Sequence, residues 1–141
     1  ACALPFYLGN ALVGLNKMDQ AAVSFHQALT IAPDHAGAHI GLGIPLLALG
    51  KPDEAVASYA KAITVMPNNA EAHNNLGNAL LSLGKLDEAV ASYAKAIDVK
   101  PNYAEARYNL GNAFQKLGKL DEAVASFHNA LAIKPDRKSV V

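Results

Sequence analysis

The sequence predicts an all-α protein built from stacked pairs of helices, and three repeated features support this. The segment DEAVASYAKAI occurs unchanged at Asp53–Ile63 and at Asp87–Ile97. A close variant, DEAVASFHNAL, begins at Asp121. Prolines recur every 34 residues, at Pro33, Pro67, Pro101 and Pro135. A fixed period of this length is typical of architectures in which each repeat packs only on its neighbours.

The first helix of each unit is predicted from an amphipathic stripe followed by a stop signal. In the third unit apolar residues step by three, one and three over Leu76–Leu83, which is the spacing of one helix face. Gly84 follows and suits the left-handed geometry that ends a helix. The same slot holds Asn16, Gly50 and Gly118, so we expect a turn at each of these positions.

The second helix of each unit begins near an acidic pair and ends at the periodic proline. We expect Asp87 to cap this helix in the third unit, because its side-chain oxygen can accept a backbone N–H there. Ala89, Tyr93 and Ala96 recur in every unit as alanine, aromatic and alanine, and they form the stripe predicted to be buried. Pro101 prevents the helix from continuing. One such helix pair cannot bury its apolar face alone, whereas a stack of pairs can.

These residues resemble the tetratricopeptide repeat, a 34-residue helix-turn-helix unit with a leucine-glycine, alanine, aromatic, alanine, proline pattern. The leucine-glycine pair is present as Leu8-Gly9, Leu42-Gly43, Leu76-Gly77 and Leu110-Gly111. The predicted units are 2–35, 36–69, 70–103 and 104–137, with residues 138–141 as a residual tail. The resemblance implies a right-handed solenoid whose first helices line a concave groove that binds peptides or proteins.

Pro45 departs from the pattern, because the matching slot holds alanine in the other three units. It lies in the interior of a first helix, where a proline removes one backbone hydrogen bond and costs roughly 3 kcal/mol. We therefore expect this helix to be bent or interrupted. A kink tolerated by the flanking repeats and a hinge or deliberately shaped groove wall are the two explanations.

The end of the last unit also departs from the family. Such arrays commonly end with an extra polar helix, and the final residues RKSVV are too few to form one. An apolar face that includes Ala130, Leu131 and Ile133 is therefore predicted to be bare unless further repeats or another molecule cover it. The cover that we expect is the first repeat of another copy of the chain.

The composition argues against several classes of partner. Twelve basic residues balance twelve acidic ones, so no net charge attracts the protein to nucleic acid or to an anionic membrane. Cys2 is the only cysteine, so no internal disulfide can form and the compartment stays open, with the cytoplasm favoured.

No combination of residues predicts catalysis or a cofactor. The HExxH, CxxC and glycine-rich phosphate-loop patterns do not occur in the sequence, and no nucleophile is paired with a base. His39 and His73 share a slot in adjacent units. A two-histidine metal site would need further ligands that cannot be named, so packing is the favoured explanation. The sequence therefore predicts a protein that is not an enzyme and takes no cofactor or metal.

The slots predicted to face the groove differ between the two halves of the chain. In the first two units they are mostly apolar, with Phe6, Tyr7, Asn10, Ile40 and Ile44. In the last two units they are amides, acids and a tyrosine, namely Glu71, Asn74, Asn75, Asn78, Glu105, Tyr108, Asn109 and Asn112. Apolar residues that point at solvent usually mark a contact surface, and an amide can both donate to and accept from a peptide backbone. Irregular packing around Pro45 and simple solvation of the amides are the alternatives.

Asn75 and Asn109 occupy matching slots, and this row is similar to the asparagine ladder in the repeats of O-linked N-acetylglucosamine transferases. Some chaperone-binding relatives instead clamp a terminal carboxylate with lysine and arginine beside asparagine. The matching basic slots here hold Glu105 or Asn109, so carboxylate clamping is disfavoured. Glu71 and Glu105 favour a neutral or basic ligand segment over an acidic one.

Three functions remain open at this level. We favour a non-catalytic scaffold for protein–protein interaction that binds a peptide segment in the concave groove. One alternative is that the repeats are the substrate-docking part of a larger glycosyltransferase-like enzyme. The other is a module that associates with itself through its terminal repeat faces.

Overall fold

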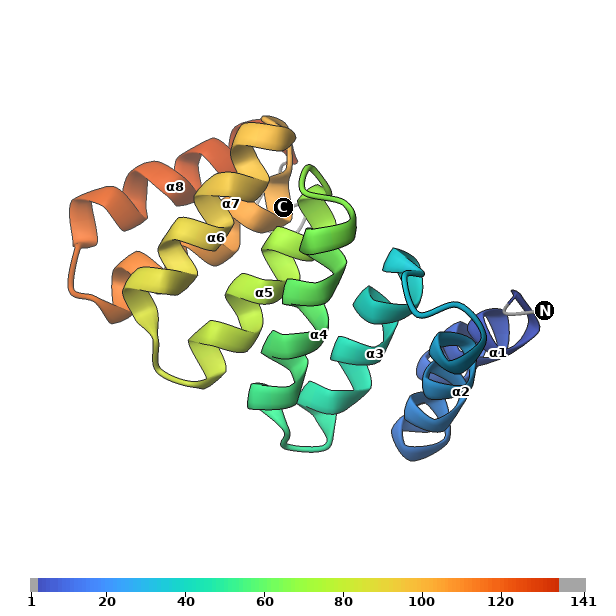
Figure 1. The fold of residues 1–141 in the computed structure, drawn as a ribbon. Coiled ribbons are helices and arrows are strands. Elements are labelled where there is room, and N and C mark those ends of the chain that lie inside the picture. The colour runs from blue at the N-terminus through green and yellow to red at the C-terminus, as the bar shows by residue number, and fades with distance from the viewer. Residues whose placement is uncertain (1–2, 135–141) are drawn as a thin grey trace.

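The computed structural model describes residues 3–134, which form eight α-helices and no strand. In chain order these are α1 (Ala3–Gly14), α2 (Met18–Ile31), α3 (Ala36–Ala48), α4 (Pro52–Val65), α5 (Ala70–Ser82), α6 (Leu86–Val99), α7 (Ala104–Lys116) and α8 (Leu120–Ile133). Each helix contacts the next along the chain, and α1, α3, α5 and α7 also contact one another in succession. Figure 1 shows a curved row of helix pairs with α1 and α8 at opposite ends. The predicted all-α repeat solenoid is confirmed, whereas the limits of the units stay a prediction.

The turns inside the helix pairs lie where the sequence predicts them. The left-handed residues are Asn16, Gly50, Gly84 and Gly118, with φ of 60, 74, 74 and 78°. Glycine adopts this conformation at little cost, and asparagine tolerates it better than most residues do. In the third pair the N–H of Gly84 donates to the carbonyl of Leu81 and that of Lys85 to the carbonyl of Leu80, each at 3.0 Å. These bonds satisfy carbonyls at the end of α5.

The predicted cap of the second helices is wrong. Helix α6 begins at Leu86, so the capping position belongs to Lys85, whose side chain makes no capping hydrogen bond. The carbonyl of Lys85 already accepts the N–H of Ala89 at 3.0 Å, and helical hydrogen bonding therefore starts before Asp87. Asp87 lies within the first turn, where its charge is still favourable to the helix dipole.

Side-chain caps occur instead at the starts of two first helices. His35 Nδ1 accepts the N–H of Ala38, and Asn69 Oδ1 accepts the N–H of Ala72, each at 3.0 Å. The equivalent residue before α7 is Tyr103, which makes no side-chain cap. The residue in this slot therefore caps α3 and α5. Before α7, the side chain of Tyr103 is available for another role.

Aromatic side chains of the second helices fill the space inside the helix pairs. Phe25, Tyr59 and Tyr93 are fully buried. Each ring lies against the glycine of a leucine-glycine pair, Gly9 with Phe25, Gly43 with Tyr59 and Gly77 with Tyr93. Since interiors are close-packed, a Cβ on these glycines would occupy space that the ring already fills. The periodic glycines and aromatics are therefore two parts of one packing arrangement.

Helix α3 is not interrupted at Pro45, one of the two outcomes, bent or interrupted, that the sequence predicts there. The helix extends over Ala36–Ala48 with Pro45 inside it, and the proline ring is fully buried. The N–H of Leu49 donates to the Pro45 carbonyl at 2.9 Å, so normal hydrogen bonding resumes in the following turn. Because proline has no N–H, the bond to the Gly41 carbonyl is still missing. Packing on the neighbouring helices keeps the helix continuous despite this loss.

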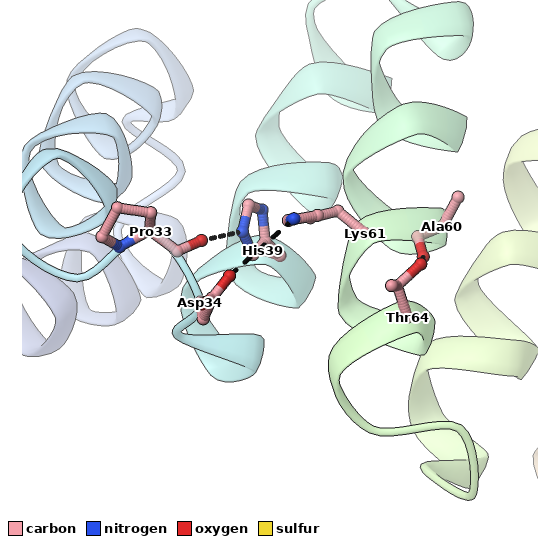
Figure 2. A network of polar contacts seen from close by, with 6 residues as sticks. All are labelled: Pro33, Asp34, His39, Ala60, Lys61 and Thr64. Carbon is pink, nitrogen blue, oxygen red and sulfur yellow. Dashed lines mark hydrogen bonds and ion pairs between the residues drawn. The ribbon is translucent and has the colours of Figure 1, made fainter.

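Two histidines tie the start of a first helix to the loop before it. His39 Nε2 lies 2.7 Å from the carbonyl oxygen of Pro33, and His73 Nε2 lies 2.8 Å from that of Pro67. Figure 2 shows the His39 ring directed at the Pro33 carbonyl. The periodic prolines thus end one helix and also present a carbonyl acceptor to the next one.

An arginine makes the equivalent connection at the start of α7. Arg107 donates from Nε at 3.0 Å and from Nη2 at 2.8 Å to the Pro101 carbonyl. Beside the first of these loops, Lys61 of α4 lies 3.8 Å from the Asp34 carboxylate (Figure 2). Both partners of this ion pair are exposed, so it contributes little to stability. Within 3–134 no helix is long and apolar enough to cross a membrane.

Candidate functional site

The apolar half of the predicted groove begins with an aromatic cluster on α1. The Phe6 ring centroid lies 4.6 Å from that of His35, 5.4 Å from that of Tyr7 and 6.2 Å from that of Phe25. Phe6 is half-buried, whereas Tyr7 and Asn10 are exposed. Phe6 therefore connects the exposed Tyr7 ring to the core ring of Phe25.

The two predicted isoleucines of α3 differ in exposure. Ile40 belongs to the hydrophobic core, and only Ile44, one turn later, presents a substantial apolar surface to solvent. Ile40 therefore supports this part of the surface from below, and Ile44 is the member that a ligand can contact.

The amide half contains a hydrogen-bond connection between two first helices. Asn109 Nδ2 on α7 donates to Asn74 Oδ1 on α5 at 3.1 Å. The Asn74 side chain is only 1 % exposed, and its own Nδ2 has no hydrogen-bond partner within the described residues. Asn74 and Asn109 therefore hold α5 and α7 together, and Asn74 offers almost no surface to a ligand.

Asn78 also has a structural partner. The hydroxyl of the buried Tyr93 donates to Asn78 Oδ1 at 2.6 Å. The Asn78 Nδ2 group makes no side-chain hydrogen bond to other residues of 3–134. The same holds for the half-buried amides of Asn75 and Asn112. These three amides are therefore the ones available to a peptide backbone.

Four of the predicted residues converge on one pocket of about 310 Å³. Its lining consists of Ile44 from α3, Ala70, Glu71 and Asn75 from α5, Lys100 and Tyr103 from the loop before α7, and Glu105 from α7. The pocket lies where the apolar half meets the amide half. An apolar side chain, an amide and two carboxylates therefore surround one space.

The two carboxylates outnumber the one ammonium, that of Lys100, among the residues that line this pocket. Burial raises the pKa of the Tyr103 hydroxyl, the carboxylates of Glu105 and Glu71 raise it further, and the Asn74 amide partly opposes them. Burial also raises the pKa of Tyr59, with a contribution from Glu71. A hydroxyl whose ionisation is opposed by carboxylates lies in a region that favours positive charge.

Lys100 and Tyr103 are pocket residues that the sequence interpretation missed. The Lys100 ammonium lies 4.8 Å from the centroid of the Tyr103 ring, within the range of a cation–π contact. One signal was present in the sequence, since Tyr103 occupies the slot of the capping residues His35 and Asn69. A tyrosine cannot cap a helix in the same way, which indicates another role for its ring.

A second pocket, of about 430 Å³, lies on the last helix pair. It is lined by Ala104, Glu105, Tyr108, Phe127, Ala130, Leu131 and Lys134. The predicted groove residue Tyr108 is exposed and packs against Phe127, with ring centroids 5.6 Å apart. Of the residues that the sequence predicts to be bare at this end, Leu131 and Ile133 are exposed, whereas Ala130 is buried.

The arrangement provides surfaces for recognition. Within 3–134 no group of three or more His, Cys, Asp or Glu side chains is placed to hold a metal ion. His39 and His73 each face a backbone carbonyl, in keeping with a packing role.

Comparison with known families identifies the repeat. Profiles described as TPR repeat match residues 46–84 and 77–118, and profiles described as tetratricopeptide repeat match residues 12–57 and 104–137. The chain belongs to the tetratricopeptide repeat family. The matches of one profile alone span about half of the chain, and together the profiles extend from the first helix into the last.

Several solved structures have the same fold. TTC0263, a thermophilic TPR protein in Thermus thermophilus, is 28% identical with a TM-score of 0.87, over 95% of this chain and 75% of that one. YrrB, described as a TPR protein with an unusual peptide-binding site, is 27% identical with a TM-score of 0.83, over 98% and 71%. MamA is 26% identical with a TM-score of 0.82, over 90% and 74%. No curated protein matches the sequence.

Proposed function

We propose that the chain is a non-catalytic scaffold that binds a segment of another protein along its concave groove. The observation that carries this proposal is the 310 Å³ pocket, where Ile44, Glu71, Asn75 and Glu105 converge from three successive first helices. These residues belong to different units, so they form a common surface only in the stacked array. YrrB, which has the same fold, is described as having a peptide-binding site, and this supports the same type of ligand here.

The proposed ligand has two kinds of contact. Its apolar side chains lie near Tyr7 and Ile44, and its backbone is held by the available amides of Asn75, Asn78 and Asn112. Burial of apolar surface contributes about 25 cal/mol per Å² before ordering costs are subtracted. Phe6, Ile40, Asn74 and Asn109 act indirectly, since they hold the helices that carry these contacts.

A basic residue of the ligand fits the pocket between Glu71 and Glu105. Both carboxylates are exposed at its edge, and both contribute to the raised pKa of Tyr103. Lys100 also lines the pocket, but its ammonium is placed over the Tyr103 ring. We therefore expect a ligand segment with one lysine or arginine near an apolar residue, and only a modest effect of salt.

The test is selection of peptides on the immobilised chain from a displayed random library. Affinities of the recovered peptides are then measured for the wild type and for two double variants, Glu71→Gln with Glu105→Gln and Asn75→Ala with Asn112→Ala. We expect lysine or arginine to be enriched, and each double variant to bind about tenfold more weakly, a loss of roughly 1.4 kcal/mol.

A matched control removes the same charge away from the groove. Glu88 and Glu122 are exposed in the first turns of α6 and α8, so Glu88→Gln with Glu122→Gln should leave affinity unchanged. Helicity must be equal in all variants. If the groove variants bind normally while the control variant loses binding, the ligand lies on another face and the proposal is wrong.

The docking part of a larger glycosyltransferase-like enzyme is the weaker alternative. It depends on Asn75 and Asn109 acting as equivalent members of one row. Asn109 donates to Asn74, whereas Asn75 lines the pocket, so the two amides have different surroundings. We therefore favour the scaffold that uses the pocket over the row of equivalent amides.

A further inference from the structure

The 310 Å³ pocket has one basic residue in its lining, and a tight turn holds that residue against an aromatic ring. Lys100 follows the last residue of α6, and its carbonyl accepts the N–H of Tyr103 at 3.0 Å. The Lys100 ammonium lies 4.8 Å from the centroid of the Tyr103 ring, within the range of a cation–π contact. The face of the Tyr103 ring is therefore a cation-binding surface that the chain itself occupies.

Two carboxylates line the same pocket without a cationic partner. Glu71 and Glu105 lie in the lining with Lys100, and neither forms an ion pair with another residue of 3–134. Lys100 itself contacts the Tyr103 ring and pairs with no acid among these residues. A cation that reaches both the ring and a carboxylate would make a contact that Lys100 does not make.

The Tyr103 ring lies beside these acids and beside a fixed amide. Burial raises the pKa of its hydroxyl, Glu105 and Glu71 raise it further, and the Asn74 amide partly opposes them. All three side chains are therefore close enough to act on the hydroxyl. Asn74 is buried, and Asn109 donates to its Oδ1 at 3.1 Å. Because Asn74 is held in this way, a ligand cation meets a largely preformed surface at the ring.

The packing of the repeat does not require these groups. One unit earlier, the slots of the lysine, the tyrosine and the first acid hold Met66, Asn69 and Gly37. Asn69 caps α5 by accepting the N–H of Ala72, so its side chain serves the helix. The helix pairs stack equally without an aromatic ring, a lysine and an acid at these places, and recognition is the role left for the three together.

We propose that the peptide ligand presents an arginine to this pocket and that its guanidinium replaces the Lys100 ammonium on the Tyr103 ring. This inference rests on the proposed groove function and names the side chain that enters the pocket. A planar guanidinium can stack on a ring and also donate two parallel hydrogen bonds to a carboxylate such as Glu71 or Glu105. A ligand lysine would only exchange one ammonium for another, and Lys100 has the advantage of being tethered beside the ring. Arginine is therefore favoured over lysine.

Small probes test the pocket apart from the rest of a peptide. N-acetyl-arginine amide, N-acetyl-lysine amide and the uncharged N-acetyl-citrulline amide are titrated into the chain, and the ring resonances of Tyr103 are followed by NMR. We expect the arginine probe to bind at least about threefold more tightly than the lysine probe. The citrulline probe should leave these resonances unchanged. An arginine probe that binds no more tightly than the lysine probe overturns the choice of arginine.

Substitutions in the turn test the exchange of cations. Lys100→Ala should raise the affinity for the arginine probe by about threefold to tenfold, because the internal competitor is gone. Lys95→Ala is the matched control, since Lys95 is an exposed lysine of α6 outside the pocket, and it should change the affinity much less. Tyr103→Phe keeps the ring and should still bind, whereas Tyr103→Leu should bind about tenfold more weakly.

Two results with these variants would overturn the proposal. Equal affinities of Lys100→Ala and Lys95→Ala show that Lys100 does not compete for the ring. Unchanged binding by a Tyr103→Leu protein of normal helicity places the cation elsewhere.

The peptide selection separates this inference from the groove function. Selected peptides that need Asn75 and Asn112, carry no arginine and bind Tyr103→Leu normally would support the groove function and contradict the arginine site. Binding of the arginine probe by a chain that selects no peptide would support the arginine site and contradict the groove function.

Discussion

Helices α3 and α5 have the same length and equivalent places in successive pairs, but their sequences agree only on one side. The slots that pack against neighbouring helices and loops are identical, with His39 and His73, Leu42 and Leu76, and Gly43 and Gly77. The slots predicted to face the groove are different, with Ile40 and Asn74, Gly41 and Asn75, and Ile44 and Asn78. Packing constrains the first set, so the second set is where recognition can vary.

The difference also changes the core of each pair. The buried tyrosines Tyr59 and Tyr93 occupy the same slot of α4 and α6. The Tyr93 hydroxyl donates to Asn78, whereas the matching residue of α3 is Ile44, whose side chain has no acceptor. A groove residue in α5 therefore also supports its own helix pair, and its counterpart in α3 does not.

The largest effect is expected where the two helices agree. A Cβ at Gly77 would lie 2.5 Å from Tyr93 Cε1, and one at Gly43 would overlap the Tyr59 ring. Gly77→Ala and Gly43→Ala should each lower the free energy of unfolding by about 2 kcal/mol, because overpacking outweighs the better helix propensity of alanine. Chemical denaturation followed by circular dichroism measures the change.

Gly14 provides the control for these glycine substitutions. It lies at the end of α1, and an added Cβ would meet nothing within 4 Å. Gly14→Ala should therefore stabilise the protein slightly, by up to about 1 kcal/mol. A large difference between Gly43→Ala and Gly77→Ala would contradict the view that the two helix pairs share one packing arrangement.

A smaller effect is expected where the helices differ. Asn78→Ala and Tyr93→Phe both remove the hydrogen bond between α5 and α6, so a double-mutant cycle should give a coupling energy of about 1 kcal/mol. The matched cycle of Ile44→Ala with Tyr59→Phe should give a value near zero. Equal coupling in the two cycles would mean that the Tyr93–Asn78 bond contributes nothing specific to α5.

The fold could be predicted from the sequence because the residue in each periodic slot has one structural role. The left-handed turn at Gly84 and the buried ring of Tyr93 depend on properties of the residue itself, and both are found as predicted. The cap at Asp87 was wrong because the capping position lies two residues earlier, at Lys85, where the helical hydrogen bonding begins.

The candidate site was less predictable, because it depends on distances between units. Slot position alone does not distinguish Ile40, which is buried, from Ile44, which is exposed. Lys100 and Tyr103 enter the pocket from a loop, and the sequence interpretation considered only first helices. The pairing of Asn109 with Asn74 likewise required the separation of α5 and α7.

The smallest effect, and the one whose sign is hardest to predict, is expected on replacing Pro45. The matching residue of α5 is Ala79. Pro45→Ala restores a backbone N–H and should recover roughly 3 kcal/mol of helix stability. Because the ring is fully buried in an unbroken helix, the change also removes two methylenes at about 0.8 kcal/mol each. It further increases the entropy of the unfolded chain, which costs about 0.4–1 kcal/mol. The expected net result is stabilisation by about 0.5–1 kcal/mol, measured as a shift in the denaturation midpoint.

Pro52→Ala is the control. Pro52 is the first residue of α4, where proline is well tolerated, so its loss should be slightly destabilising. If Pro45→Ala is destabilising as well, α3 and its neighbours are packed around the proline ring, and the groove wall on that side depends on it.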